Sequence, residues 1–121
     1  MNGQTSKALR ITLLVYAVWW AIYGLLHVVA PVMMQAKDPA IERALGAAFL
    51  AFAFGAGWAY WEKAWDSVKL VVQVQIVWMS LYAITMAWGL LGGEITAAAW
   101  PPTVIGAVFA ILLAVLYTRE K

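Results

Sequence analysis

Long uncharged stretches separated by short charged clusters form the pattern of polar and apolar positions along this chain. The stretches hold 20 residues between Arg10 and Pro31, 18 between Arg43 and Glu62, 24 between Lys69 and Glu94, and 24 between Glu94 and Arg119. A membrane-spanning helix needs about 20 apolar residues, so each stretch fits one helix and none fits two. The pattern predicts an all-α membrane protein with four transmembrane helices, at about residues 9–30, 39–61, 68–91 and 101–118.

Apolar residues follow one another without alternation inside these stretches, as in LGAAFLAFAF (45–54) and AILLAVLY (110–117). Strands of a membrane β-barrel alternate polar and apolar residues over about 10 positions, so this pattern excludes a barrel. The connections between the expected helices are short, which favours an up-down-up-down bundle that forms a single domain over residues 1–121.

Proline, aspartate and glycine mark the expected helix ends. Pro31 disfavours helix in the residue before it, and Asp38 followed by Pro39 is typical of an N-cap with proline at the first helical position. Gly92-Gly93 is a common helix stop. The first apolar stretch is longer than the ~7–15 residues of a signal peptide and no A-x-A site follows it. We therefore expect it to be a retained first helix.

Composition agrees with a membrane location, since 65% of the 121 residues are hydrophobic, 12% are charged and the mean hydropathy is +0.82. Soluble domains have about 25% charged residues. The chain has no cysteine, which excludes disulfides, thiol chemistry and cysteine-ligated metals within it.

The distribution of the basic residues predicts the orientation. Six of the eight fall on one side of the expected bundle: Lys7, Arg10, Lys63, Lys69, Arg119 and Lys121. Lys37 and Arg43 fall on the other side. The positive-inside rule then places both termini in the cytoplasm. The formal charge of +2 is thus an orientation signal, and we expect no nucleic-acid partner.

The single histidine, His27, lies at the end of the first helix. Helical spacing places Tyr16, Trp20 and Tyr23 on its face. The third helix carries a similar row: Gln75, Trp78, Tyr82 and Thr85. Polar groups in membrane helices usually turn inward. These rows are either a network whose members satisfy one another, or a slot for a lipid, quinone, pigment or other amphiphile.

Charged residues cluster on the expected outer side. They are Asp38, Glu42, Arg43 and Glu94. One interpretation is a salt-bridged cap in which Arg43 pairs with an acidic member of this cluster. The alternative is a shallow polar site that combines His27, Arg43 and Glu94.

Small residues recur every four positions in the second helix, at Ala47, Ala51, Gly55 and Ala59. Small residues let helix backbones approach closely in lipid. The row is either a packing face inside the bundle or a homodimer face. The eight tryptophans include several at expected helix boundaries, and some of the others should face lipid or a neighbouring protein.

The chain lacks the residues that several classes of function require. A zinc site needs three or four ligands, and two-histidine haem ligation is impossible within a chain that has one histidine; one axial histidine to a haem or pigment stays open. Ion-coupled transport needs a buried charge near the midplane, and the small multidrug exporters use a glutamate in the first helix that is absent here. Ser80 and Thr85 have no nearby base, and hydroxyls in membrane helices usually bond to their own helix. We therefore expect no enzyme.

The first helix ends with Gly24-Leu25-Leu26 up to Pro31, Arg43-Ala44-Leu45-Gly46 opens the second, and a Gly/Ala-rich run continues to Gly57. In these motifs the chain resembles the small bacterial four-helix membrane proteins called DoxX-like. The resemblance covers the whole chain in helix layout and the first half in motif. It implies a multi-pass protein of the bacterial inner membrane and brings no catalytic residues.

Together these features favour a non-enzymatic accessory or structural subunit. Its partners would be membrane lipids, further copies of the chain or a larger membrane complex, and it could hold a lipid. One alternative is a bundle that binds a quinone or pigment at the His27 face. The other is a small transporter or channel subunit.

Overall fold

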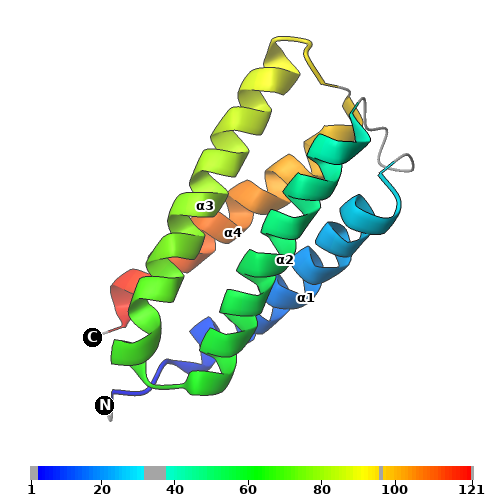
Figure 1. Cartoon of the computed structure of the whole chain (residues 1–121). Helices are drawn as coiled ribbons and strands as arrows, with labels where there is room; N and C mark the ends of the chain where they lie inside the picture. Colours follow the sequence, from blue (N-terminus) through cyan, green and yellow to red (C-terminus); the bar gives the residue numbers. More distant parts are fainter. Residues whose placement is uncertain (1–2, 32–37, 96, 121) are drawn as a thin grey trace. The chain divides into compact units, whose positions relative to one another are not determined.

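The computed structural model describes residues 3–31, 38–95 and 97–120. It contains the helices α1 (Lys7–Val29), α2 (Pro39–Glu62), α3 (Trp65–Leu91) and α4 (Trp100–Arg119), with a 3₁₀ turn, η1 (Ala97–Ala99), before α4 (Figure 1). The prediction of an all-α chain with four long helices is confirmed. Each helix, with η1 counted as the start of the fourth, is long and apolar enough to cross a membrane.

The chain forms two compact units, which we describe separately. One unit is the hairpin of α1 and α2 from Arg10 to Lys63. Contacts pair the start of α1 with the end of α2 (Arg10 with Tyr60) and the end of α1 with the start of α2 (His27 with Glu42), so these two helices are antiparallel.

The second unit contains α3, η1, α4 and the described residues before Arg10. Gln73 near the start of α3 bonds Tyr117 near the end of α4, and Gly106 lies under the ring of Tyr82. This pair of helices is therefore antiparallel as well.

The capping residues identified in the sequence lie at the ends of the helices. Asp38 is the N-cap of α2, and its Oδ1 accepts hydrogen bonds from the amides of Ala40 (3.1 Å) and Ile41 (3.3 Å). Gly92 caps α3, and Gly93 has a φ of 72°, a left-handed conformation that only glycine adopts without strain. The α2–α3 connection is shorter than expected, since α3 already begins at Trp65.

The segment before α1 belongs to the α3–α4 unit. The amide of Trp65 donates to the carbonyl of Gly3 (2.6 Å), Gln4 forms an isolated antiparallel bridge with Ala64, and the amide of Ser6 donates to Oε1 of Glu120 (2.7 Å). This segment therefore links the start of α3 with the end of α4.

The helices α1 and α2 cross at two glycines. A Cβ atom built on Gly46 would lie 2.7 Å from the carbonyl oxygen of Gly24 and 2.8 Å from Cβ of His27. A Cβ on Gly24 would lie 2.8 Å from Cβ of Phe49 and 2.9 Å from the carbonyl oxygen of Gly46. Neither position has room for a side chain, so the close approach depends on both glycines.

The small-residue row of α2 does not form this contact. Ala47 and Ala51 are exposed, Gly55 is half-buried, and Ala59 is buried. The buried face of α2 is a different row, formed by Gly46, Phe49, Ala53, Ala56 and Ala59. Because α2 is rich in alanine and glycine throughout, small residues occur on both faces, and the register with α1 decides which of them pack. The homodimer interpretation of the exposed row stays a prediction.

Candidate functional site in the α1–α2 hairpin

A continuous series of aromatic rings runs along the buried face of α1. Tyr16, Trp20 and His27 are buried in that order along the helix, and Tyr23 is half-buried between them. Ring centroids are 6.3 Å apart for Tyr16 and Trp20, 5.4 Å for Trp20 and Tyr23, and 4.3 Å for Tyr23 and His27. The row predicted from helical spacing is thus present as a chain of ring contacts.

Phe49 of α2 completes this series, although it was not among the residues predicted to share this face. Its ring stacks on Trp20 with centroids 4.8 Å apart and planes 6° apart, and it contacts the rings of Tyr23 (5.3 Å) and His27 (5.6 Å). Offset-stacked and edge-on rings stabilise each other beyond their buried area. These ring faces are therefore occupied by one another inside the hairpin.

Both ring nitrogens of His27 contact oxygen atoms. Nδ1 lies 2.8 Å from the carbonyl oxygen of Tyr23, one turn earlier in α1, and Nε2 lies 2.8 Å from Oε1 of Glu42 in the first turn of α2. The side chain of His27 is 4% exposed and that of Glu42 is 21% exposed. Buried polar groups are costly unless they are hydrogen-bonded, and this imidazole has a partner at each nitrogen.

The carbonyl oxygen of Tyr23 and Oε1 of Glu42 also determine which nitrogens of His27 carry a proton. A carbonyl oxygen can only accept, so Nδ1 of His27 carries the proton that it donates to Tyr23. A contact of 2.8 Å between Nε2 and the Glu42 carboxyl then requires one more proton between them. The pair is either imidazolium with carboxylate or imidazole with carboxylic acid, and it has no net charge in both forms.

The partner of Glu42 differs from the one expected in a salt-bridged cap. Glu42 pairs with His27 rather than with Arg43, and Asp38 caps its own helix. Arg43 is exposed and forms no ion pair or hydrogen bond with the part of the chain that the structure describes. Glu94 belongs to the α3–α4 unit and lies in the turn after α3. Of the pairings in the cap interpretation, Arg43 with Glu42 does not form, because consecutive helical residues point in different directions. The pairing of Arg43 with Glu94, and the polar site of His27, Arg43 and Glu94, would join the two units and stay predictions.

The ligand-binding residues predicted on α3 lie in the other unit. Tyr82 is buried, Trp78 is half-buried, and their ring centroids are 5.9 Å apart. Gln75 of the same row is also buried. Thr85 is exposed, and its hydroxyl donates to the carbonyl of Leu81. That bond confirms the expectation that hydroxyls bond to their own helix.

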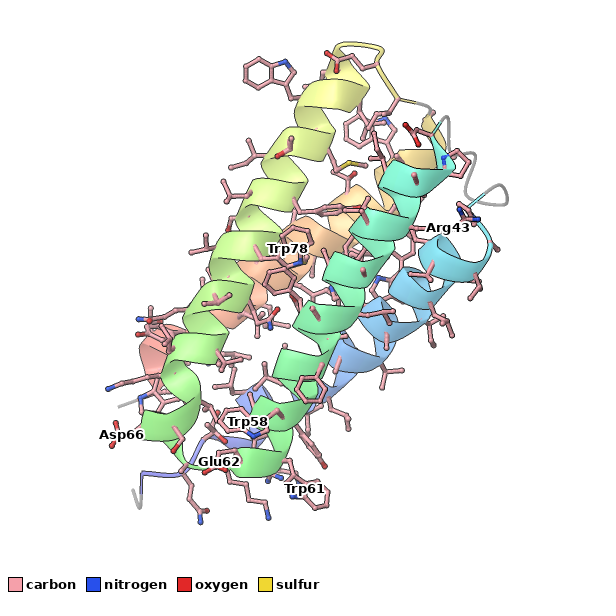
Figure 2. All side chains as sticks on the ribbon, viewed as in Figure 1. Arg43, Trp58, Trp61, Glu62, Asp66 and Trp78 are labelled. Atoms are coloured by element: carbon pink, nitrogen blue, oxygen red, sulfur yellow. The ribbon has the colours of Figure 1, made fainter. Side chains whose placement is uncertain are left out.

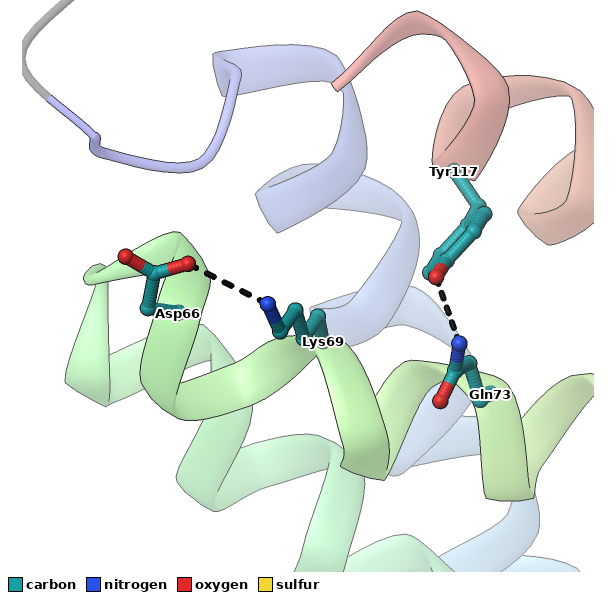
Figure 3. Close-up of polar contacts among 4 residues, drawn as sticks. All are labelled: Asp66, Lys69, Gln73 and Tyr117. Atoms are coloured by element: carbon teal, nitrogen blue, oxygen red, sulfur yellow. Dashed lines mark hydrogen bonds and ion pairs between the residues drawn. The ribbon is translucent and has the colours of Figure 1, made fainter. Parts of the chain in front are cut away.

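Polar contacts gather at the ends of the helices. Lys69 pairs with Asp66 (3.4 Å), and Nε2 of Gln73 donates to the hydroxyl of Tyr117 (2.5 Å), as Figure 3 shows. Figure 2 shows Trp58, Trp61 and Glu62 at the C-terminal end of α2 and Arg43 at its opposite end. Within the described residues, no three His, Asp or Glu side chains are grouped so that they could hold a metal ion.

Comparisons of this chain with protein-family models, with curated proteins and with solved structures gave no match.

Proposed function

We propose that this protein is a non-enzymatic, multi-pass membrane subunit with an accessory or structural role. The observation that supports it most is the His27 face. Its imidazole is bonded at both nitrogens, and its aromatic neighbours pack on one another and on Phe49. A quinone or pigment would need ring faces or a nitrogen that the hairpin already uses, so the geometry favours a structural core over a ligand slot.

The outward surface supports contact with lipid or other membrane proteins. Large apolar side chains at helical spacing are exposed on α1 and α3: Ile11, Val15, Val18, Ile22, Leu25 and Val29, and Leu70, Val74, Val77, Leu81, Ile84, Trp88 and Leu91. Apolar patches of more than a few hundred Å² are rare on soluble monomers. We propose the bacterial inner membrane as the location and DoxX-like membership as the family, the latter on the motifs of the first half alone.

A native mass spectrum after gentle extraction tests the proposed role. We expect masses above the 13.3 kDa of one chain that dissociate into further copies or other polypeptides. The complex should persist in a Tyr82→Phe variant, which keeps the ring. A bare monomer under every mild extraction condition would contradict the accessory role, and a quinone or pigment at one per chain would establish the ligand-binding alternative.

We further propose an up-down-up-down course with both termini in the cytoplasm. The Ser6–Glu120 hydrogen bond supports termini on one side, because it joins the residues before α1 to those after α4. The surplus of basic residues at these ends supports the cytoplasmic side.

Labelling of an introduced cysteine tests this orientation. The chain has no cysteine of its own, so Glu94→Cys, at the exposed α3–η1 turn, carries the one reactive thiol. We expect a membrane-impermeant maleimide to label it in intact spheroplasts. A matched Lys63→Cys variant should react after permeabilisation alone. The reverse pattern would invert the topology.

A further inference from the structure

An apolar groove runs between α1 and α2 of the hairpin. It has a volume of about 390 Å³ and is lined by Ala17, Val18, Ala21, Leu50, Ala53 and Phe54. The small side chains of Ala17, Ala21 and Ala53 leave this volume unfilled. The exposed side chains of Val18 and Phe54 border it. A cavity of about 150 Å³ holds a benzene molecule, so this groove has room for a run of methylene groups.

The positively charged side chain of Arg10 lies on the same face of α1 as the groove. Arg10 precedes Ala17 by seven residues and Ala21 by eleven, close to two and three whole helical turns, so the three residues share one face. Nε of Arg10 donates to the carbonyl of Tyr60 (3.3 Å), and the guanidinium lies 4.9 Å from the centre of the Tyr60 ring. These contacts hold the guanidinium and leave its terminal nitrogens as donors.

The distance along α1 from Arg10 to the groove residue Ala21 matches the hydrocarbon thickness of one leaflet. Eleven residues of helix span about 16 Å at 1.5 Å per residue, and half of a hydrocarbon core of about 30 Å is 15 Å. On α2, Trp61 is 79% exposed and lies about two helical turns beyond Phe54, at the end where Tyr60 contacts Arg10. Tryptophan is enriched at the headgroup level. Glu62 and Lys63 follow there with opposite charges, and Lys7 lies one turn before Arg10 on α1, so this end of the hairpin has a net positive charge.

We propose that this hairpin binds one phospholipid of the leaflet at the Arg10 end. An acyl chain lies in the groove over Ala17 and Ala21, and the headgroup phosphate accepts hydrogen bonds from Arg10. Arginine suits this role because its planar guanidinium donates two parallel bonds to a phosphate. The inference rests on the proposed membrane-embedded role and adds to it a site for one lipid.

The test is native mass spectrometry of the delipidated full chain titrated with dioleoylphosphatidylglycerol, with dioleoylglycerol as the phosphate-free comparison. We expect the wild type to bind one phosphatidylglycerol, and dioleoylglycerol to bind at least tenfold more weakly. Arg10→Gln should weaken phosphatidylglycerol binding by about tenfold, since it removes a charge-assisted hydrogen bond. Ala21→Phe, which fills the groove, should weaken binding of both lipids.

Matched controls separate the site from general surface effects. Arg119→Gln removes an exposed arginine of the other unit, and Ala44→Phe adds a phenyl ring at an exposed position of α2 outside the groove; both should bind as the wild type does. Equal losses in Arg10→Gln and Arg119→Gln, unchanged binding in Ala21→Phe, or no retained phosphatidylglycerol would each overturn the inference. If the chain still assembles with further copies or other polypeptides but binds no phosphatidylglycerol, the lipid site is wrong and the accessory role still stands.

Discussion

Alanine in place of Gly46 is expected to lower the melting temperature in detergent by roughly 10 °C, from a loss of at least about 2 kcal/mol. The added methyl group would meet the carbonyl oxygen of Gly24 at 2.7 Å and side-chain carbons of His27 and Val28 at 2.8 Å. One of these atoms belongs to the backbone, which cannot rotate away, so α1 and α2 must separate. Separation also removes Phe49 from the rings of α1. Thermal unfolding followed by circular dichroism and size-exclusion chromatography measures the effect.

Gly57→Ala is the matched control on the same helix. Its added Cβ would lie 3.9 Å from Cβ of Ala17, an ordinary van der Waals distance. Alanine favours the helix over glycine by about 0.5–1 kcal/mol, so this variant should be as stable as the wild type or more stable. Equal melting temperatures for Gly46→Ala and the wild type would show that the two helices do not cross at Gly46.

The second large effect concerns the hydrogen-bonded pair of His27 and Glu42. Glu42→Ala is expected to cost about 2 kcal/mol, because it leaves Nε2 of a buried imidazole without its partner. Glu42→Gln should cost less than half of that. Its amide NH₂ can donate to Nε2 while Nδ1 keeps the proton bonded to Tyr23. Equilibrium unfolding of the reconstituted variants measures both values.

The neighbouring Arg43 supplies the control, since Arg43→Ala removes an exposed side chain with no described partner and should change stability by less than about 0.5 kcal/mol. A double-mutant cycle of His27→Ala and Glu42→Ala should give a coupling energy of about 1–2 kcal/mol. Additive single-mutant losses would show that the two side chains act independently.

The helices could be predicted because their signals are local. Charge-free stretches set their number, and Asp38-Pro39 and Gly92-Gly93 set two of their ends, since a cap depends on residues within one turn. The row from Tyr16 to His27 was predicted for the same reason: helical periodicity alone places these side chains on one face.

The partners of that row could not be predicted in the same way. Phe49 and Glu42 reach it across a connection, and their placement depends on the register between two helices that periodicity does not determine. A signal was present, because Gly24 and Gly46, and likewise His27 and Glu42, lie almost equally far from the middle of the connection between α1 and α2. Antiparallel helices bring such pairs together. The row of Ala47, Ala51, Gly55 and Ala59 was predicted from spacing within α2 alone, without asking which residues of α1 lie opposite it.

The link between the N-terminal segment and the second unit has a consequence for biosynthesis. The partners within the α1–α2 hairpin have all been translated once Lys63 has left the ribosome, so this hairpin can assemble early. Ser6 must wait for Glu120, which lies 114 residues later in the chain. The segment before α1 is therefore fastened in two steps, first to Ala64 and Trp65 at the start of α3 and later to Glu120 after α4. Until α3 begins to emerge, α1 can pair with α2 without being held by either of these contacts.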